Sequence, residues 1–146
     1  MNLYLMRHGQ AADPLEDPQQ GLTAAGRAAI EALAQRLLPR GVCFKQVWHS
    51  DKARARQTAE IMAAILAPGV TPRMRRGLKP NDDPADLIAE IERWDEDTLI
   101  ASHLPFVPTL VAELTGQPVE MGLAPGTIIC LQHQDPAWRI VWQAVP

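Results

Sequence analysis

The chain has 146 residues, a length that suits one domain with a single hydrophobic core, and we expect one domain over residues 1–146. Its 47% hydrophobic content is ordinary for a globular protein, and its formal net charge of -3 argues against a dedicated nucleic-acid binder. No apolar run approaches the roughly 20 residues of a membrane span. Arg7 and His8 also interrupt the first apolar stretch, so we expect neither a signal peptide nor a membrane anchor.

The two cysteines, Cys43 and Cys130, have neither the spacing of a metal site nor that of a disulfide framework. We interpret both as buried thiols of a protein in the reducing cytoplasm.

The first half of the chain predicts, in order, a strand over 2–6, a helix over 23–38, a strand over 45–49 and a helix over 51–66. Thr23 and Ser50 precede the two helices and are the predicted N-caps. Pro39 and Gly41 end the first helix, and the second ends before Pro68.

The second half predicts a surface excursion over 72–84, a helix over 85–94, a strand over 98–102, a helix over 105–116 and strands over 127–132 and 139–143. Asp83 and Pro84 are expected to cap the helix that follows them. Alternation of strands and helices predicts an α/β fold, a three-layer α/β/α sandwich with a mostly parallel central sheet.

Polar side chains follow three of the predicted strands. His8, Ser50 and His103 each come directly after an apolar run. Because ligands of parallel sheets bind outside the carboxyl ends of the strands, we expect these three side chains to share one site.

The helix after Ser50 adds a cation to this site. Arg54 lies in its first turn, with Gln57 and Thr58 on the same face, whereas Arg56 is turned away by roughly 200°. A helix N-terminus with an inward arginine favours an anion. Arg7 and Arg54 together match the oxygens of a phosphoryl group, so the predicted ligand is a phosphate.

Two histidines have predicted chemical roles. His8 between two arginines should stay neutral, and a neutral imidazole is a competent nucleophile. His103 can donate a hydrogen bond to phosphoryl oxygens in the transition state. His49 is expected to point away from the Ser50 pocket, and His133 lies in a late turn, so both are interpreted as structural.

At these residues the chain resembles a known group of enzymes. The segments "MRHG" (6–9), "LTAAG" (22–26), "SDKARARQT" (50–58) and "SHLPFV" (102–107) resemble the histidine phosphatase superfamily, also called phosphoglycerate-mutase-like. The short length, "GLKP" (77–80) and the segment over 101–116 are most similar to the SixA-type phosphohistidine phosphatases. The resemblance implies the phosphoglycerate-mutase-like fold, no cofactor and no metal. It implies His8 as the phosphorylated nucleophile and assigns the phosphate pocket to Arg7, Arg54 and His103.

The chain departs from most of the superfamily at the general acid. Members usually carry a carboxylate after the second helix, whereas "LKPNDDPADL" (78–87) offers only Asp82, Asp83 and Asp86. Whether Asp82 or Asp83 acts as the acid stays open. Cleavage of an alkyl phosphate ester depends more on a positioned proton donor than cleavage of the weak P–N bond of phosphohistidine does. The lack of the usual general acid therefore favours phosphohistidine as the substrate.

The expected function is therefore a cytoplasmic, monomeric phosphohistidine phosphatase. Its expected partner is a histidine-phosphorylated protein, either a phosphotransfer domain or a phosphocarrier. Only short segments flank the site, which favours a histidine on a protein surface over a small enclosed substrate. The alternatives are a small-molecule phosphomonoesterase, a mutase and a non-catalytic phosphoprotein-binding module. For the basic residues, partner contact and simple solvation both stay open; these residues are Arg73, Arg75, Arg76 and Lys79.

Overall fold

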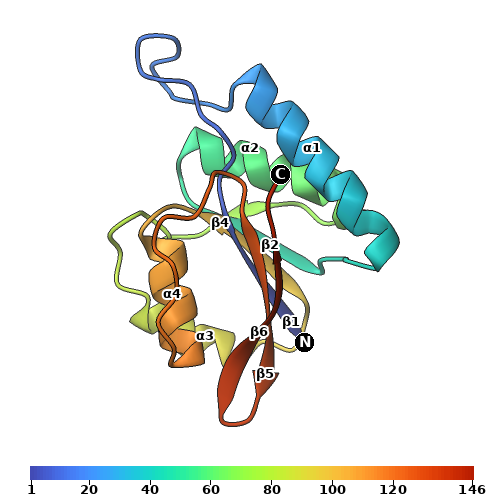
Figure 1. The fold of residues 1–146 in the computed structure, drawn as a ribbon, viewed down its shortest axis with the longest axis vertical. Helices are drawn as coiled ribbons and strands as arrows, with labels where there is room; N and C mark the ends of the chain where they lie inside the picture. The colour runs from blue at the N-terminus through green and yellow to red at the C-terminus, as the bar shows by residue number, and fades with distance from the viewer.

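The computed structural model describes residues 1–146 and contains six strands and four α-helices (Figure 1). In chain order these are β1 (Asn2–Arg7), α1 (Ala24–Leu37), a 3₁₀ turn (Leu38–Arg40), β2 (Gln46–His49), α2 (Ala53–Leu66), β3 (Arg73–Met74), α3 (Ala85–Ile91), β4 (Thr98–Ser102), α4 (Phe106–Thr115), β5 (Ile128–Gln134) and β6 (Ala137–Ala144).

All six strands belong to one sheet with the order β3-β2-β4-β1-β5-β6. The pairs β3–β2, β2–β4 and β4–β1 are parallel, and β5 pairs antiparallel with both β1 and β6. The prediction of a mostly parallel sheet is confirmed. The parallel strands end together at one edge of the sheet, where the polar residues after β1, β2 and β4 must therefore meet.

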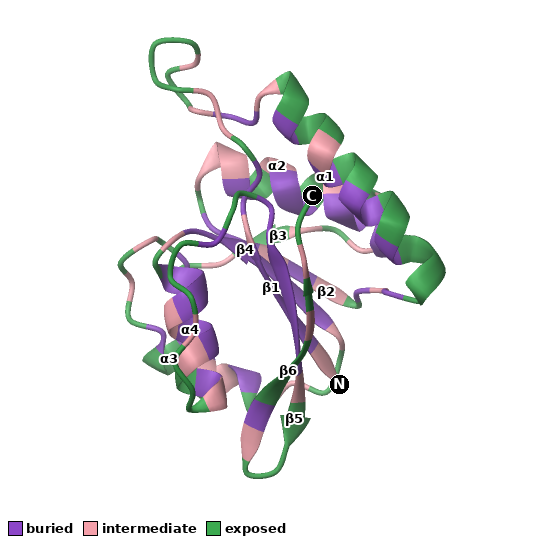
Figure 2. Cartoon of the chain, in the orientation of Figure 1, coloured by how far each residue is buried: buried purple, intermediate pink, exposed green.

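The helices cover both faces of the sheet, as Figure 1 shows with α1 and α2 on one side and α3 and α4 on the other. Alternate residues of β1 supply the two cores: Tyr4 and Met6 pack in the cluster with α1 and α2, and Leu3 and Leu5 pack in the cluster with α4 and α3. The central strands are buried on both faces (Figure 2). The three-layer α/β/α sandwich is confirmed. None of its helices combines the length and the apolar character that crossing a bilayer requires.

The two predicted N-caps have different outcomes. Thr23 caps α1, since its hydroxyl oxygen accepts the backbone N–H of Gly26 at 2.9 Å. The prediction for Ser50 is wrong, because α2 begins at Ala53 with Lys52 in the N-cap position and no side-chain cap. The Ser50 hydroxyl instead contacts a histidine in another loop.

Several other boundaries differ from the prediction. The surface excursion contains the short edge strand β3, whose exposed residues carry no apolar pattern. The predicted helix over 85–94 ends at Ile91, and β5 and β6 extend further toward their connecting turn than predicted. Asp83 does support the start of α3, since its carboxylate accepts the N–H of Ala85 at 3.0 Å. Cys130 is buried as expected, but Cys43 is only half-buried, so that part of the prediction is wrong.

Candidate active site

The residues after three parallel strands meet at the carboxyl edge of the sheet. Arg7, the last residue of β1, is paired with Ser102, the last residue of β4. The N–H of His8 donates to the carbonyl of Ser102 at 2.9 Å, and the N–H of Ser50 donates to the carbonyl of Ala101 at 3.3 Å. These backbone bonds continue the sheet register by one residue, and they hold the segments that carry both histidines next to each other.

The His8 ring has a defined proton arrangement. Its Nδ1 lies 2.7 Å from the carbonyl oxygen of Gly9. A carbonyl oxygen only accepts, so Nδ1 must carry the proton and Nε2 keeps its lone pair. The side chain is only 9% exposed. The local backbone thus fixes a neutral tautomer with one nucleophilic nitrogen.

The protonation of His8 is disfavoured in this environment. The pKa of His8 is lowered to about 4, mainly by burial and less by the positive charges of Arg54 and Arg7, while the bond to the Gly9 carbonyl opposes the shift. The predicted neutral state is supported, but its main cause is burial rather than the two arginines. The His8 imidazole is therefore neutral at pH 7.

His103 lies beside His8, with ring centroids 5.2 Å apart and the ring planes inclined by 59°. Its Nε2 lies 2.6 Å from the hydroxyl oxygen of Ser50, and its buried Nδ1 has no hydrogen-bond partner. The pKa of His103 is lowered to about 3, first by burial and then by the charges of His8 and Arg54. If the Ser50 hydroxyl donates to Nε2, the Nδ1–H of His103 is a donor that still lacks an acceptor.

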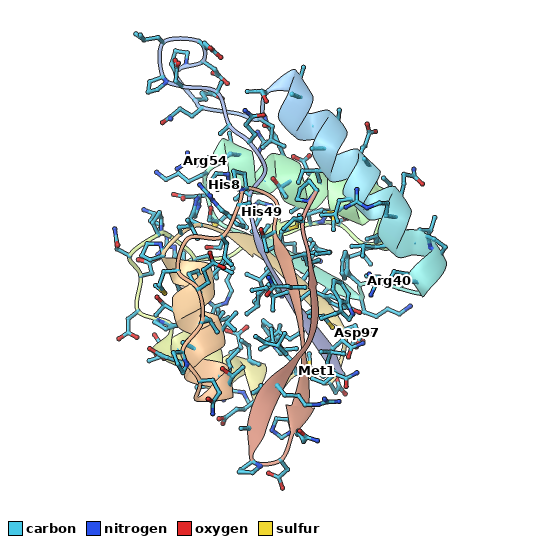
Figure 3. The ribbon with its side chains drawn as sticks, in the orientation of Figure 1. Met1, His8, Arg40, His49, Arg54 and Asp97 are labelled. Atoms are coloured by element: carbon cyan, nitrogen blue, oxygen red, sulfur yellow. The ribbon has the colours of Figure 1, made fainter.

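Arg54 is the second residue of α2 and is half-buried near both histidines, whose pKa values it lowers. Figure 3 shows Arg54 and His8 together at the same end of the sheet, opposite Met1. Arg7 donates through Nη1 to the carbonyl of Leu123 at 2.7 Å, while its buried Nε has no partner. Burial lowers the pKa of Arg7. Two half-buried guanidinium groups therefore supply positive charge next to the His8 ring.

Arg56 does not take part, as its position on the helix predicts. Its side chain is exposed and forms an ion pair with Glu60 at 2.8 Å. The helical rotation of about 200° from Arg54 explains this outward direction.

One supporting contact of the site could not be recognised in the sequence. Thr58 is fully buried, and its hydroxyl accepts the N–H of Gly9 at 2.9 Å while donating to the carbonyl of Arg54 at 2.8 Å. It thereby ties the His8 loop to the first turn of α2. Its spacing of four residues from Arg54 placed it on the correct face, but the tie to Gly9 needs the folded chain. Gln57 on the same face accepts the N–H of Leu22 at 2.7 Å.

The two aspartates considered as acids have separate positions. Asp83 is exposed and accepts the N–H of Ala85 at the start of α3. Asp82 accepts the N–H of Lys79 at 2.9 Å and lines a cleft that reaches Ser50. Neither carboxylate forms a hydrogen bond with a histidine ring.

The two remaining histidines do not belong to the pair formed by His8 and His103. His49 is buried with Nδ1 at 2.8 Å from the carbonyl of Ser50. The prediction of a turn at His133 is wrong, because β5 extends through this residue, whose exposed ring packs edge-on against Trp138. No three histidine, cysteine, aspartate or glutamate side chains lie close enough together to hold a metal ion.

The sequence of the chain is similar to a known protein family and to several of its members. The sequence profile of the histidine phosphatase superfamily (branch 1) matches residues 3–79. Over 119 residues the chain is 32% identical to the phosphohistidine phosphatase SixA of Escherichia coli, covering 78% of this chain and 74% of SixA. Over 112 residues it is 38% identical to an uncharacterized protein of Picosynechococcus, covering 72% of this chain and 67% of that protein.

Solved structures agree with the sequence matches. The structure of the protein histidine phosphatase SixA complexed with tungstate superposes with a TM-score of 0.86 and 28% identity, covering 99% of this chain and 97% of that chain. A phosphoserine phosphatase of Entamoeba histolytica in complex with 3-phosphoglyceric acid has the same fold, with a TM-score of 0.77, 16% identity, and coverage of 99% and 97%. The phosphoglycerate-mutase-like fold is confirmed.

Proposed function

The chain belongs to branch 1 of the histidine phosphatase superfamily, and from that membership we propose that it is a phosphohistidine phosphatase that dephosphorylates other proteins. The observation that carries the proposal is the proton arrangement of His8. Its Nδ1–H is committed to the Gly9 carbonyl, so Nε2 is free to attack phosphorus.

The proposed reaction has two displacements. In the first, His8 Nε2 forms a bond to phosphorus while the P–N bond of the substrate phosphohistidine breaks, and the leaving imidazole takes a proton from water. In the second, water attacks phospho-His8, the bond between Nε2 and phosphorus breaks, and orthophosphate leaves. The free, neutral His8 is regenerated, ready for another turnover.

The other three residues are proposed to bind the phosphoryl group. Arg7 and Arg54 provide positive charge for its oxygens, and the unpartnered Nδ1 of His103 is a candidate hydrogen-bond donor. The tungstate bound to the structurally similar SixA is a tetrahedral oxyanion, which supports an oxyanion pocket in this fold. The partly desolvated site strengthens these charge interactions.

The preference for phosphohistidine over an ester follows from the positions of the carboxylates. Asp83 stabilises the start of α3 and Asp82 accepts a backbone N–H, so neither is positioned by a bond to the histidine pair. An imidazole leaves phosphorus more easily than an alkoxide, so it depends less on a general acid. SixA, to which the chain is similar, is a phosphohistidine phosphatase by name.

The proposed partner is a histidine-phosphorylated phosphotransfer domain or phosphocarrier protein. We propose a cytoplasmic location for the reaction, supported by the two free thiols of Cys43 and Cys130. A monomer suffices for the proposed chemistry, because all four proposed site residues come from one chain.

A paired turnover assay tests the proposal. Phosphate release is measured from a phosphohistidine-bearing carrier protein, p-nitrophenyl phosphate and sugar phosphates, using the wild type, His8→Ala and Arg56→Ala. We expect preference for the phosphoprotein, with loss of about a thousandfold or more in kcat/KM for His8→Ala. Arg56→Ala, which removes only an exposed ion pair, should stay within about twofold. Preference for an ester, abolished by Asp82→Asn, would instead identify a small-molecule phosphomonoesterase.

A further inference from the structure

The cleft that Asp82 lines opens beside the histidine pair. It has a volume of about 520 Å³ and reaches Ser50, whose hydroxyl contacts His103. We name it the side cleft; its lining includes Ser50, Asp51, Met74, Arg76, Lys79 and Asp82. A group bound there would lie immediately next to the proposed phosphoryl site.

The loop that carries Arg76 is fixed at both ends to the carboxyl edge of the sheet. On one side, the N–H of Arg75 donates to the carbonyl of His49 at 3.0 Å, at the end of β2. On the other side, the carbonyl of the fully buried Leu78 accepts the hydroxyl of Ser102 at 2.6 Å, at the end of β4. The loop is thus anchored to the same two strands that position Ser50 and His103.

The side chain of Arg75 and a glycine complete this turn. The Arg75 guanidinium forms an ion pair with Glu90 of α3 and donates to the carbonyl of Arg76 at 2.6 Å. Gly77 adopts a φ of 84°, a conformation that side-chain-bearing residues rarely take. Arg75 is therefore occupied in holding the loop, which presents the next residue at the cleft.

Lys79 and Arg76 differ in whether they have an ion-pair partner at the side cleft. Lys79 lies 3.6 Å from Asp51, and Asp82 accepts the N–H of Lys79. Arg76 is exposed and has no carboxylate within 4.0 Å. Its guanidinium is therefore the cation of the cleft without an ion-pair partner and can bind an external anion, while the Asp82 carboxylate keeps its own negative charge in the same cleft.

We propose that the side cleft recognises an acidic side chain of the phosphorylated protein, close to its phosphohistidine, through Arg76. The inference rests on the proposed function, because it concerns how the same site selects its protein substrate. The anchored loop presents Arg76 without a large ordering cost, and a carboxylate on the partner complements its charge. Arg73, in contrast, lines a separate groove with Lys45 and Glu96, so it is outside the cleft.

Two synthetic phosphohistidine peptides test this proposal. They have the same length, and one carries aspartates on both sides of the phosphohistidine where the other carries asparagines. We expect the wild type to release phosphate from the acidic peptide with about three- to fivefold higher kcat/KM. Arg76→Gln should remove this preference, whereas Arg73→Gln, the same change on an exposed residue three positions earlier, should retain it. The preference should also shrink as salt is added.

The outcomes separate this inference from the proposed function. Equal turnover of both peptides by the wild type would overturn the role of the side cleft and leave the phosphohistidine phosphatase in place. An equal loss of preference in Arg73→Gln and Arg76→Gln would also overturn it, because general surface charge would then be responsible. If neither peptide releases phosphate while p-nitrophenyl phosphate does, the proposed function fails and the inference fails with it.

Discussion

The burial of His8 makes the stability of the protein depend on pH in a specific way. In the folded chain its pKa is lowered to about 4 from the model-peptide value of 6.5. An unfolded chain therefore binds a proton at His8 that the folded chain does not bind between these two values. The stability that neutral His8 contributes is fully present above pH 6.5 and is lost as the pH falls toward 4.

The size of this effect follows from the two pKa values. Where the unfolded chain carries one extra proton, the free energy of unfolding changes by about 1.4 kcal/mol per pH unit. Between pH 7 and pH 5, His8 should therefore remove about 2 kcal/mol from the free energy of unfolding. His103, with its pKa lowered to about 3, should remove a similar amount over the same interval.

The assay is urea unfolding at pH 7, 6 and 5 for the wild type and His8→Gln. The glutamine cannot titrate, so the variant should lose about 2 kcal/mol less than the wild type between pH 7 and pH 5. His133→Gln makes the same substitution at an exposed histidine and serves as the control for the change of residue. Identical slopes for the wild type and His8→Gln would refute the argument, since His8 would then titrate alike in the folded and unfolded chains.

Two further substitutions test the contacts that hold the His8 loop. A Cβ at Gly26 would lie 2.3 Å from the backbone oxygen of Gln10, so Gly26→Ala should lower the melting temperature, although alanine normally stabilises a helix by about 1 kcal/mol relative to glycine. Gly122→Ala is the control, because a Cβ at Gly122 has no atom within 4 Å. Equal melting temperatures of the two variants would contradict the clash at Gly26. Thr58→Val keeps the side-chain shape but leaves the N–H of Gly9 without its acceptor, which should cost about 1–3 kcal/mol in urea unfolding. A Thr58→Val variant as stable as the wild type would show that this bond does not hold the loop.

Much of the fold follows from local sequence patterns. Three apolar runs, over 2–6, 45–49 and 98–102, are separated by amphipathic stretches and predict parallel strands with helices between them, and β1, β2 and β4 have this arrangement. The edge strand β3 escaped prediction, because its two residues are exposed and are ordered by pairing with Trp48 and His49 rather than by burial of their own. Pairing between distant segments leaves no periodic signal in so short a strand.

The proposed site was likewise predictable from the sequence in part only. The sequence by itself determined which side chains follow the strand ends and that only one of Arg54 and Arg56 can face the site, because strand direction and helical rotation are local properties. The resemblance to the histidine phosphatase motif then selected Arg54 through its spacing from Ser50. That His8, Arg54 and His103 share this site follows once the strands are taken to be parallel, and the structure brings them together.

Only the tertiary structure decided the chemistry of these side chains. Ser50 was expected to cap a helix, but its hydroxyl lies against His103, 53 residues away in the sequence. The low pKa of His8 comes first from burial, which depends on the packing of the whole carboxyl edge. Among the basic residues of the 72–84 segment, the folded chain turns Arg75 toward Glu90 and leaves Arg76 open at the side cleft. Burial, proton position and the pairing of charges depend on residues distant in the chain, so no local pattern contains them.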